Sequence, residues 1–127
     1  MEAKAPTVLV VEDDSIVNFD VTETLRQEGF QALQAYSGEQ ALQLLETESE
    51  IRVVFTDVHL PGSVDGIALT ETIQQRWPQI EVLITSAHRR PEVDRLELVS
   101  CYGRFVEKPY PALAVARRIH EIVEQAA

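Results

Sequence analysis

Short apolar runs alternate with helical patterns along this chain, and the alternation restricts the fold more than any other feature of the sequence. The runs cover residues 8–11, 30–36, 53–55 and 82–84, and the pair Phe105 and Val106. Short runs rich in valine and isoleucine are typical of strands that are buried on both faces of a parallel sheet. The run at 30–36 is introduced by Gly29 and predicts a strand at an edge of the sheet.

Between the runs, apolar residues recur at helical spacing, and signals for the start and the end of helices flank them. The residues that mark helix ends are Gly29, Ser37, Gln40, Pro78, Pro91 and Pro111. Ser37 and Gln40 form a capping box, and Gly29 suits a helix C-terminus. Pro91 and Pro111 each suit a first helical position. Strand and helix follow each other five times, which predicts an α/β fold: a doubly wound, five-stranded parallel sheet with five helices on its two faces.

Length and charge limit the class of protein. A chain of 127 residues predicts one domain over 1–127, with 1–6 and the last few residues as loose ends. Its 21 acidic and 11 basic residues give a net charge of -10. This charge repels phosphate backbones and anionic lipids, so we expect no direct binding of nucleic acid and no membrane contact. Cations and basic surfaces are the favoured partners.

Cysteine content and hydropathy indicate the compartment. Cys101 is the single cysteine, so the chain forms no intramolecular disulfide and contains no CxxC motif. The apolar segment before Glu12 is too short for a signal peptide or a membrane span. These features predict a cytoplasmic protein.

Polar residues gather where the predicted strands end. In doubly wound sheets, ligands bind beyond the carboxyl ends of the strands. The residues at those ends are Glu12, Asp13, Asp14, Asp57, Thr85, Ser86, His88, Glu107 and Lys108. Each alone has an ordinary structural explanation, since Asp14 or Ser15 can cap the next helix and a single lysine is usually solvated. Three carboxylates pushed together, however, raise each other's pKa and destabilise the fold unless a cation is present. The cluster therefore predicts a site for Mg2+ or Mn2+.

Asp57 is the candidate for covalent chemistry, because it ends the central apolar run. A carboxylate placed between a metal ion and a lysine can act as the nucleophile in phosphoryl transfer and form an aspartyl phosphate. Lys108 is the candidate lysine.

These motifs resemble the receiver domain of two-component response regulators, and the chemotaxis receivers in particular. The resemblance rests on VLVVEDD near the start, TDVHLPG around Asp57, DG at 65–66, ITSA around Ser86 and FVEKP around Lys108, and it covers essentially the whole chain. It implies a flavodoxin-like strand order of 2-1-3-4-5. It also implies that Asp57 accepts phosphate from a sensor histidine kinase or a histidine phosphotransfer protein. The chain would then be a signalling domain and not an enzyme, although small donors would phosphorylate it and it would lose the phosphate unaided.

The resemblance implies further roles at the metal. Asp13 and Asp57 would be direct Mg2+ ligands, together with the main-chain carbonyl of His59. Glu12 would act through water.

Other roles implied by the resemblance concern the phosphoryl group and the response to it. Ser86 and Lys108 would bind phosphoryl oxygens, and Phe105 would be an aromatic switch that turns inward when Ser86 moves. The Lys108–Pro109 peptide bond would be cis. The face formed by the fourth helix, fifth strand and fifth helix would then bind an output partner or a second copy in a homodimer.

Two departures from the family pattern are visible. The turn PGSVDG has one more residue between Pro61 and Gly66 than the commonest pattern, and we expect the pocket to survive it. Phe105 lacks the hydroxyl of the common tyrosine, so its two positions are expected to differ mainly by burial.

His59 and His88 lie two residues beyond Asp57 and Ser86. Both are explained as exposed loop imidazoles. The sharper hypothesis is that they tune the lifetime of the phosphate, because a neutral imidazole orients water and an imidazolium stabilises negative charge. A softer metal such as Zn2+ is a further alternative.

Other functions remain to be weighed. A hydrolase of the dehalogenase type would need a second acid at the position of His59 and a cap domain. A serine hydrolase built on Ser86 and His88 lacks the GxSxG motif. An FMN binder would need a hydroxyl and glycine loop where the acids follow the first run. The closer alternative is a phosphate sink, a relay or a docking module that does not switch an output. The sequence leaves open whether the chain stands alone or belongs to a longer regulator or hybrid kinase.

Overall fold

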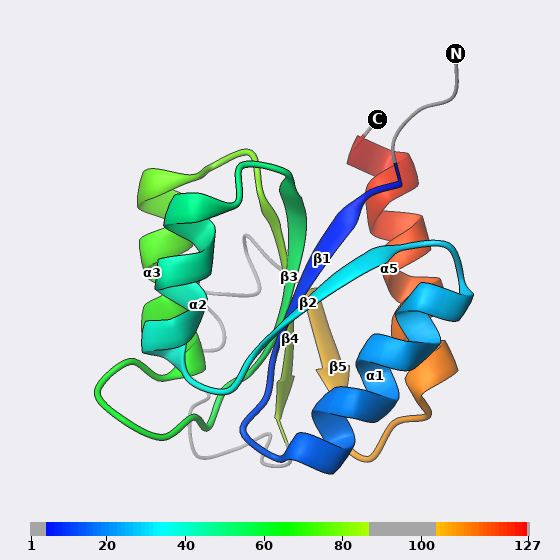
Figure 1. Ribbon diagram of the computed structural model, residues 1–127, viewed down its shortest axis with the longest axis horizontal. Helices are drawn as coiled ribbons and strands as arrows, with labels where there is room; N and C mark the ends of the chain where they lie inside the picture. The colour runs from blue at the N-terminus through cyan, green and yellow to red at the C-terminus, as the bar shows by residue number, and fades with distance from the viewer. Residues whose placement is uncertain (1–4, 87–103, 127) are drawn as a thin grey trace.

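The computed structural model describes residues 5–86 and 104–126, which form a five-stranded parallel sheet with helices on both faces (Figure 1). The strands are β1 (Thr7–Val11), β2 (Gln31–Ala35), β3 (Ile51–Asp57), β4 (Glu81–Ser86) and β5 (Arg104–Glu107). Their order across the sheet is β2-β1-β3-β4-β5. The predicted strand order is confirmed, and β2 lies at the edge as expected.

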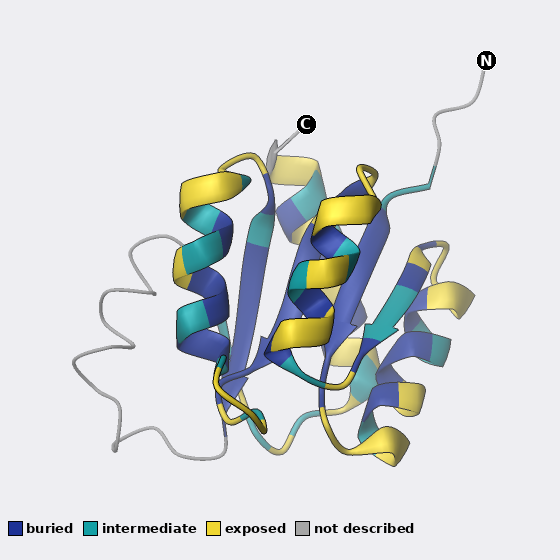
Figure 2. Ribbon diagram, turned by 60° about the vertical axis from the view of Figure 1, so that its left-hand side comes forward, coloured by how far each residue is buried: buried dark blue, intermediate teal, exposed yellow. Residues whose placement is uncertain are grey.

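Four helices belong to the described residues: α1 (Ser15–Gln27), α2 (Gly38–Thr47), α3 (Gly66–Arg76) and α5 (Ala112–Ala126). Helices α2 and α3 cover one face of the sheet, and α1 and α5 cover the other (Figures 1 and 2). The further helix that Pro91 was expected to open lies outside the described residues. In the described parts of the chain, no helix combines the length and the apolarity that a membrane crossing requires.

The alternating side chains of the central strands feed two cores, one on each face. Val8 and Val10 of β1 pack towards α1 and α5, whereas Leu9 and Val11 pack towards α2 and α3. Every residue of β1 is buried, as Figure 2 shows for the middle of the sheet. A strand that is apolar on both sides can form only between two helical layers, so the sequence of β1 requires this three-layer arrangement.

The helix ends follow the sequence signals with two differences. The Ser37 hydroxyl accepts a hydrogen bond from Gln40 N at 3.1 Å, but the Gln40 side chain accepts from Tyr36 N at 2.8 Å, one residue earlier than in a standard capping box. Helix α3 ends at Arg76 and Trp77 is its C-cap, so the helix stops one residue before the end that Pro78 allows. Gly29 follows α1 with φ of 97°, in the left-handed region that ends many helices.

The loop between β3 and α3 folds against the start of α2. Both the main-chain N and the hydroxyl of Ser63 donate to Glu39 Oε2 at 2.9 Å. The Ser63 N–H bond is the largest of the contacts that lower the pKa of Glu39. Gly62 has φ of 87°, and a side chain at this position would meet the Glu39 carboxylate. The loop that exceeds the common pattern by one residue is therefore held by a contact with α2.

Replacing Gly66 or Gly29 with alanine is expected to lower the free energy of unfolding by different amounts. A Cβ at Gly66 would lie 2.0 Å from the main-chain oxygen of Asp57, so Gly66→Ala must displace the end of β3 and is expected to cost about 3 kcal/mol. A Cβ at Gly29 would meet nothing, so Gly29→Ala is expected to cost only the about 1–2 kcal/mol of the left-handed backbone. Urea unfolding of both variants measures the difference, and equal costs would contradict the close packing at Gly66.

Candidate functional site

Three carboxylates meet at the carboxyl edge of the sheet. Glu12 and Asp13 follow β1 directly, and Asp57 is the last residue of β3, which pairs with β1. Each residue contributes one carboxylate oxygen to a group whose atoms all lie within 4.8 Å of one another. The structure thus brings together the three acids that the sequence predicted to converge.

The three acids differ in burial. Glu12 is 4% exposed and Asp57 is 5% exposed, whereas Asp13 is exposed. Burial raises the pKa of Glu12 to about 7, and the charge of Asp57 adds to the effect, although the N–H of Asp14 and the charge of Lys108 act in the opposite direction. That N–H lies 2.9 Å from Glu12 Oε2. Glu12 is therefore the acid whose protonation the fold favours.

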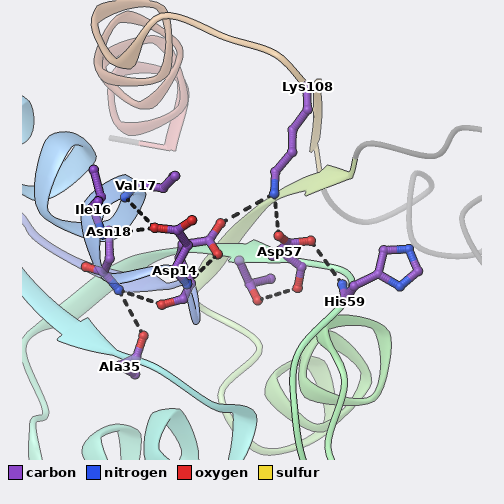
Figure 3. A network of polar contacts seen from close by, with 10 residues as sticks. Asp14, Ile16, Val17, Asn18, Ala35, Asp57, His59 and Lys108 are labelled. Atoms are coloured by element: carbon purple, nitrogen blue, oxygen red, sulfur yellow. Dashed lines mark hydrogen bonds and ion pairs between the residues drawn. The ribbon is translucent and has the colours of Figure 1, made fainter.

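Lys108 supplies the cation that the described residues place at this cluster (Figure 3). Its Nζ lies 2.5 Å from Asp57 Oδ2 and 3.5 Å from Glu12 Oε1. Partial burial alone would lower the pKa of Lys108, but the hydrogen bond that Lys108 donates to Asp57 and the charges of Asp57 and Glu12 outweigh it and raise the pKa. The lysine therefore stays charged at neutral pH. It lies just after β5, and the Lys108–Pro109 bond is cis, as expected.

Both carboxylate oxygens of Asp57 accept hydrogen bonds. Oδ1 accepts a hydrogen bond from His59 N at 3.0 Å, and Oδ2 is paired with Lys108 (Figure 3). The Thr56 hydroxyl donates to the main-chain oxygen of Asp57 at 2.9 Å. An oriented carboxylate at the end of a central strand is suited to act as a nucleophile.

The remaining predicted residues lie near this edge or outside the described residues. Ser86 is fully buried at the end of β4, where it pairs with Glu107. Phe105 is half-buried on β5 and packs on the α2 and α3 side. The His59 imidazole is exposed and points away from the Asp57 carboxylate (Figure 3). His88 lies outside the described residues.

The cluster fits a hard divalent cation. All three candidate ligands are carboxylates, and Mg2+ binds oxygen ligands, typically one or two carboxylates plus waters and phosphate oxygens. Histidine and cysteine ligands, which Zn2+ prefers, are absent from this group of described residues. The donor set therefore suits Mg2+ and gives no support to the Zn2+ alternative.

Two polar residues near the site were not predicted from the sequence. Asn18 of α1 is fully buried, and its amide donates to the main-chain oxygens of Glu12 and Ala35. The signal was available, because Asn18 shares a helical face with Val21 and Leu25, where an apolar residue is expected. The Tyr110 hydroxyl is buried without a hydrogen-bond partner among the described residues, and burial raises its pKa.

A doubly wound sheet whose carboxyl edge carries three acids and a lysine is the arrangement that the resemblance to receiver domains predicts. The model of the family described as "Response regulator receiver domain" matches residues 8–120 of this chain. The chain belongs to that family.

Curated relatives agree with this family, and a solved structure shares the fold. A "Putative response regulator NtrX-like" protein of Rickettsia felis is 32% identical over 104 residues, which are 81% of this chain and 22% of the relative. "Sensor kinase CckA" of Brucella abortus is 28% identical over 120 residues, 94% of this chain and 13% of the relative. The chain thus spans about a fifth or less of these relatives. A CheY-like receiver domain from Methanospirillum hungatei JF-1 has the same fold, with a TM-score of 0.86, 20% identity and 96% of each chain covered.

The raised pKa of Glu12 predicts how stability depends on pH in the metal-free protein. The folded-state pKa of about 7 exceeds the ordinary value of 4.5, so the folded state binds more protons between these values. Its contribution to stability is complete below the lower value and is lost as the pH rises through the upper one. Urea unfolding with a chelator, from about pH 5 to 8, is therefore expected to show a loss that Glu12→Gln removes. Parallel curves for the two proteins would contradict the raised pKa.

Proposed function

We propose that this chain is a phosphoryl acceptor in a two-component pathway and that Asp57 is the residue phosphorylated. The donor is a phosphohistidine on a sensor histidine kinase or a histidine phosphotransfer protein. The observation that carries the proposal is the buried Asp57 at the end of β3, paired with Lys108 Nζ at 2.5 Å and grouped with two further acids. Membership of the receiver family supports it.

The proposed transfer forms one bond and breaks one. A carboxylate oxygen of Asp57 attacks phosphorus, a P–O bond forms, and the P–N bond to the donor imidazole breaks with its electron pair going to nitrogen. Lys108 already contacts Asp57 and remains beside the phosphoryl oxygens as a point charge. The Ser86 hydroxyl donates to another of these oxygens. Water later hydrolyses the acyl phosphate and restores Asp57, so the chain signals and does not turn over a separate substrate.

Mg2+ has a defined set of residues in this proposal. Asp13 and Asp57 bind it directly, Glu12 acts through water, and the His59 carbonyl completes the protein's share. When bound, it neutralises charge on the phosphoryl oxygens. The clustering of the three carboxylates supports this assignment.

Phosphorylation is proposed to change the face that includes β5 and α5. Ser86 moves towards the phosphoryl group, and Phe105, half-buried on the neighbouring strand, turns into the space that is vacated. An output partner or a second copy of the chain binds the altered face. The single cysteine suits the cytoplasm, where we place this signalling.

Treatment with acetyl phosphate tests the chemistry. We expect one phosphate adduct in the mass spectrum of the intact protein, formed only with Mg2+ present and lost in Asp57→Asn, because both the metal and the nucleophile are needed. Asp20→Asn, which changes an exposed acid of α1, is the matched control and is expected to keep the adduct. If no adduct forms with this donor or with a phosphorylated kinase, the chain is a docking module and the proposal is wrong.

His59 and His88 are proposed to set the lifetime of the phosphate. Because imidazole changes charge near neutral pH, the half-life of the phosphorylated protein is expected to vary between about pH 6 and 8. Replacing both residues with alanine should remove that variation. His120→Ala is the control, since His120 packs on Phe30 with ring centroids 4.4 Å apart and has no proposed role at the phosphate. A double variant with the natural half-life at every pH would show that neither imidazole sets the lifetime of the phosphate.

A further inference from the structure

Helix α1 buries a side-chain amide on the face that packs against the sheet. Asn18 is 0% exposed, and a buried amide is costly unless its hydrogen bonds are made. Its Nδ2 donates to the main-chain oxygens of Glu12 and Ala35, both at 3.0 Å (Figure 3). A third oxygen, that of Val10, lies at 3.5 Å. The amide thus connects α1 to the ends of both β1 and β2.

The opposite end of the amide is held as well. Asn18 Oδ1 accepts a hydrogen bond from Gln34 Nε2 of β2 at 3.0 Å. The Thr22 hydroxyl lies 2.6 Å from the main-chain oxygen of Asn18 and 3.0 Å from Oδ1, and its one hydrogen favours the shorter contact. Gln34 therefore holds the oxygen end of the amide, while the main-chain carbonyls hold its nitrogen.

The Glu12 carbonyl is the functional end of this network, because it belongs to the peptide that joins Glu12 to Asp13. A peptide unit is planar, so holding its oxygen fixes the plane from which Asp13 continues. Glu12 is also held at its N–H by the Ala35 carbonyl at 3.0 Å and at its carboxylate by Asp14 N at 2.9 Å. Asp13 itself is exposed, so its direction depends strongly on this backbone.

We propose that Asn18 is a positioning residue of the metal site. Its amide holds the Glu12–Asp13 peptide in the orientation that keeps three carboxylates within 4.8 Å of one another before any cation binds. Asn18 touches neither metal nor phosphate and acts through the backbone of two acids. The inference rests on the proposed Mg2+ site and adds to it a residue that orients the ligands without contacting the metal.

Calorimetric titration with Mg2+ tests the role of Asn18 without using phosphorylation. Asn18→Leu keeps the size of the side chain and removes both donors, and we expect it to weaken Mg2+ binding about tenfold, since groups that orient metal ligands have effects of that size. Thr22→Val is the matched control in the same buried network. It removes a hydroxyl that bonds the helix backbone and leaves the amide of Asn18 to Gln34, so its Mg2+ affinity is expected to be unchanged.

Urea unfolding in chelator gives the stability of each variant, and it separates positioning from a general structural role. Unchanged Mg2+ affinity in a folded Asn18→Leu protein would overturn the inference, however much stability is lost. A natural chain that binds no Mg2+ would overturn the metal site and the inference with it. Mg2+ binding that is intact without any phosphorylation of Asp57 would overturn the proposed function alone.

If Asn18→Leu does not fold, the Mg2+ affinity of Gln34→Glu tests the role of the Asn18 amide instead. Gln34 is half-buried on the edge strand, and glutamate there replaces the donor that orients the Asn18 amide with an acceptor. Its added negative charge by itself favours a cation, so weaker Mg2+ binding is expected only if the orientation of the amide matters. Equal or tighter binding would overturn the proposed role.

Discussion

Repulsion between three carboxylates is the constraint around which this edge of the molecule is built. Glu12 and Asp57 are nearly inaccessible to water, and at an effective dielectric constant of about 20 two charges about 4 Å apart repel by about 4 kcal/mol. Opposing contacts come from the charge of Lys108 and from the N–H groups of Asp14 and His59. Each of these groups lies just beyond a strand end. The parallel sheet therefore positions at one edge both the acids and the groups that stabilise their negative charge.

Burial of apolar side chains inside the sheet offsets the repulsion between the acids at its edge. Val8, Leu9 and Val10 are fully buried, and their side chains alternate between the two cores. Burial of apolar area contributes roughly 25 cal/mol per Å2 and stabilises the strands far from the acids. The repulsion is confined to the edge of the sheet, where a bound cation can relieve it.

Sequence patterns predicted the elements and the meeting of the acids, but not the contacts that orient them. Apolar spacing indicates where strands end, and Asp57 and Lys108 follow from that position alone. Spacing marks Asn18 as a polar residue on an inward helical face, but it does not predict the bonds to Glu12 and Ala35, because these depend on how α1 lies over two strand ends. The strand order came from family resemblance, since alternation of strands and helices allows several orders. The raised pKa of Glu12 depends on burial, which no motif encodes.

The loop after Asp57 shows how a difference in length is kept away from the chemistry. Near the acid, the backbone is fixed by Val58, whose N–H bonds the Thr85 oxygen and whose oxygen accepts from Gly66 N. Beyond that point, the turn at residues 61–63 packs against the Glu39 side chain of α2. An additional residue between two fixed points of the backbone is accommodated most easily where few atoms pack against the chain, which is at the exposed turn. Because Gly66 packs directly on the oxygen of Asp57, an insertion there would move the nucleophile, whereas one beside Glu39 needs only a glycine with positive φ and a hydroxyl to bond.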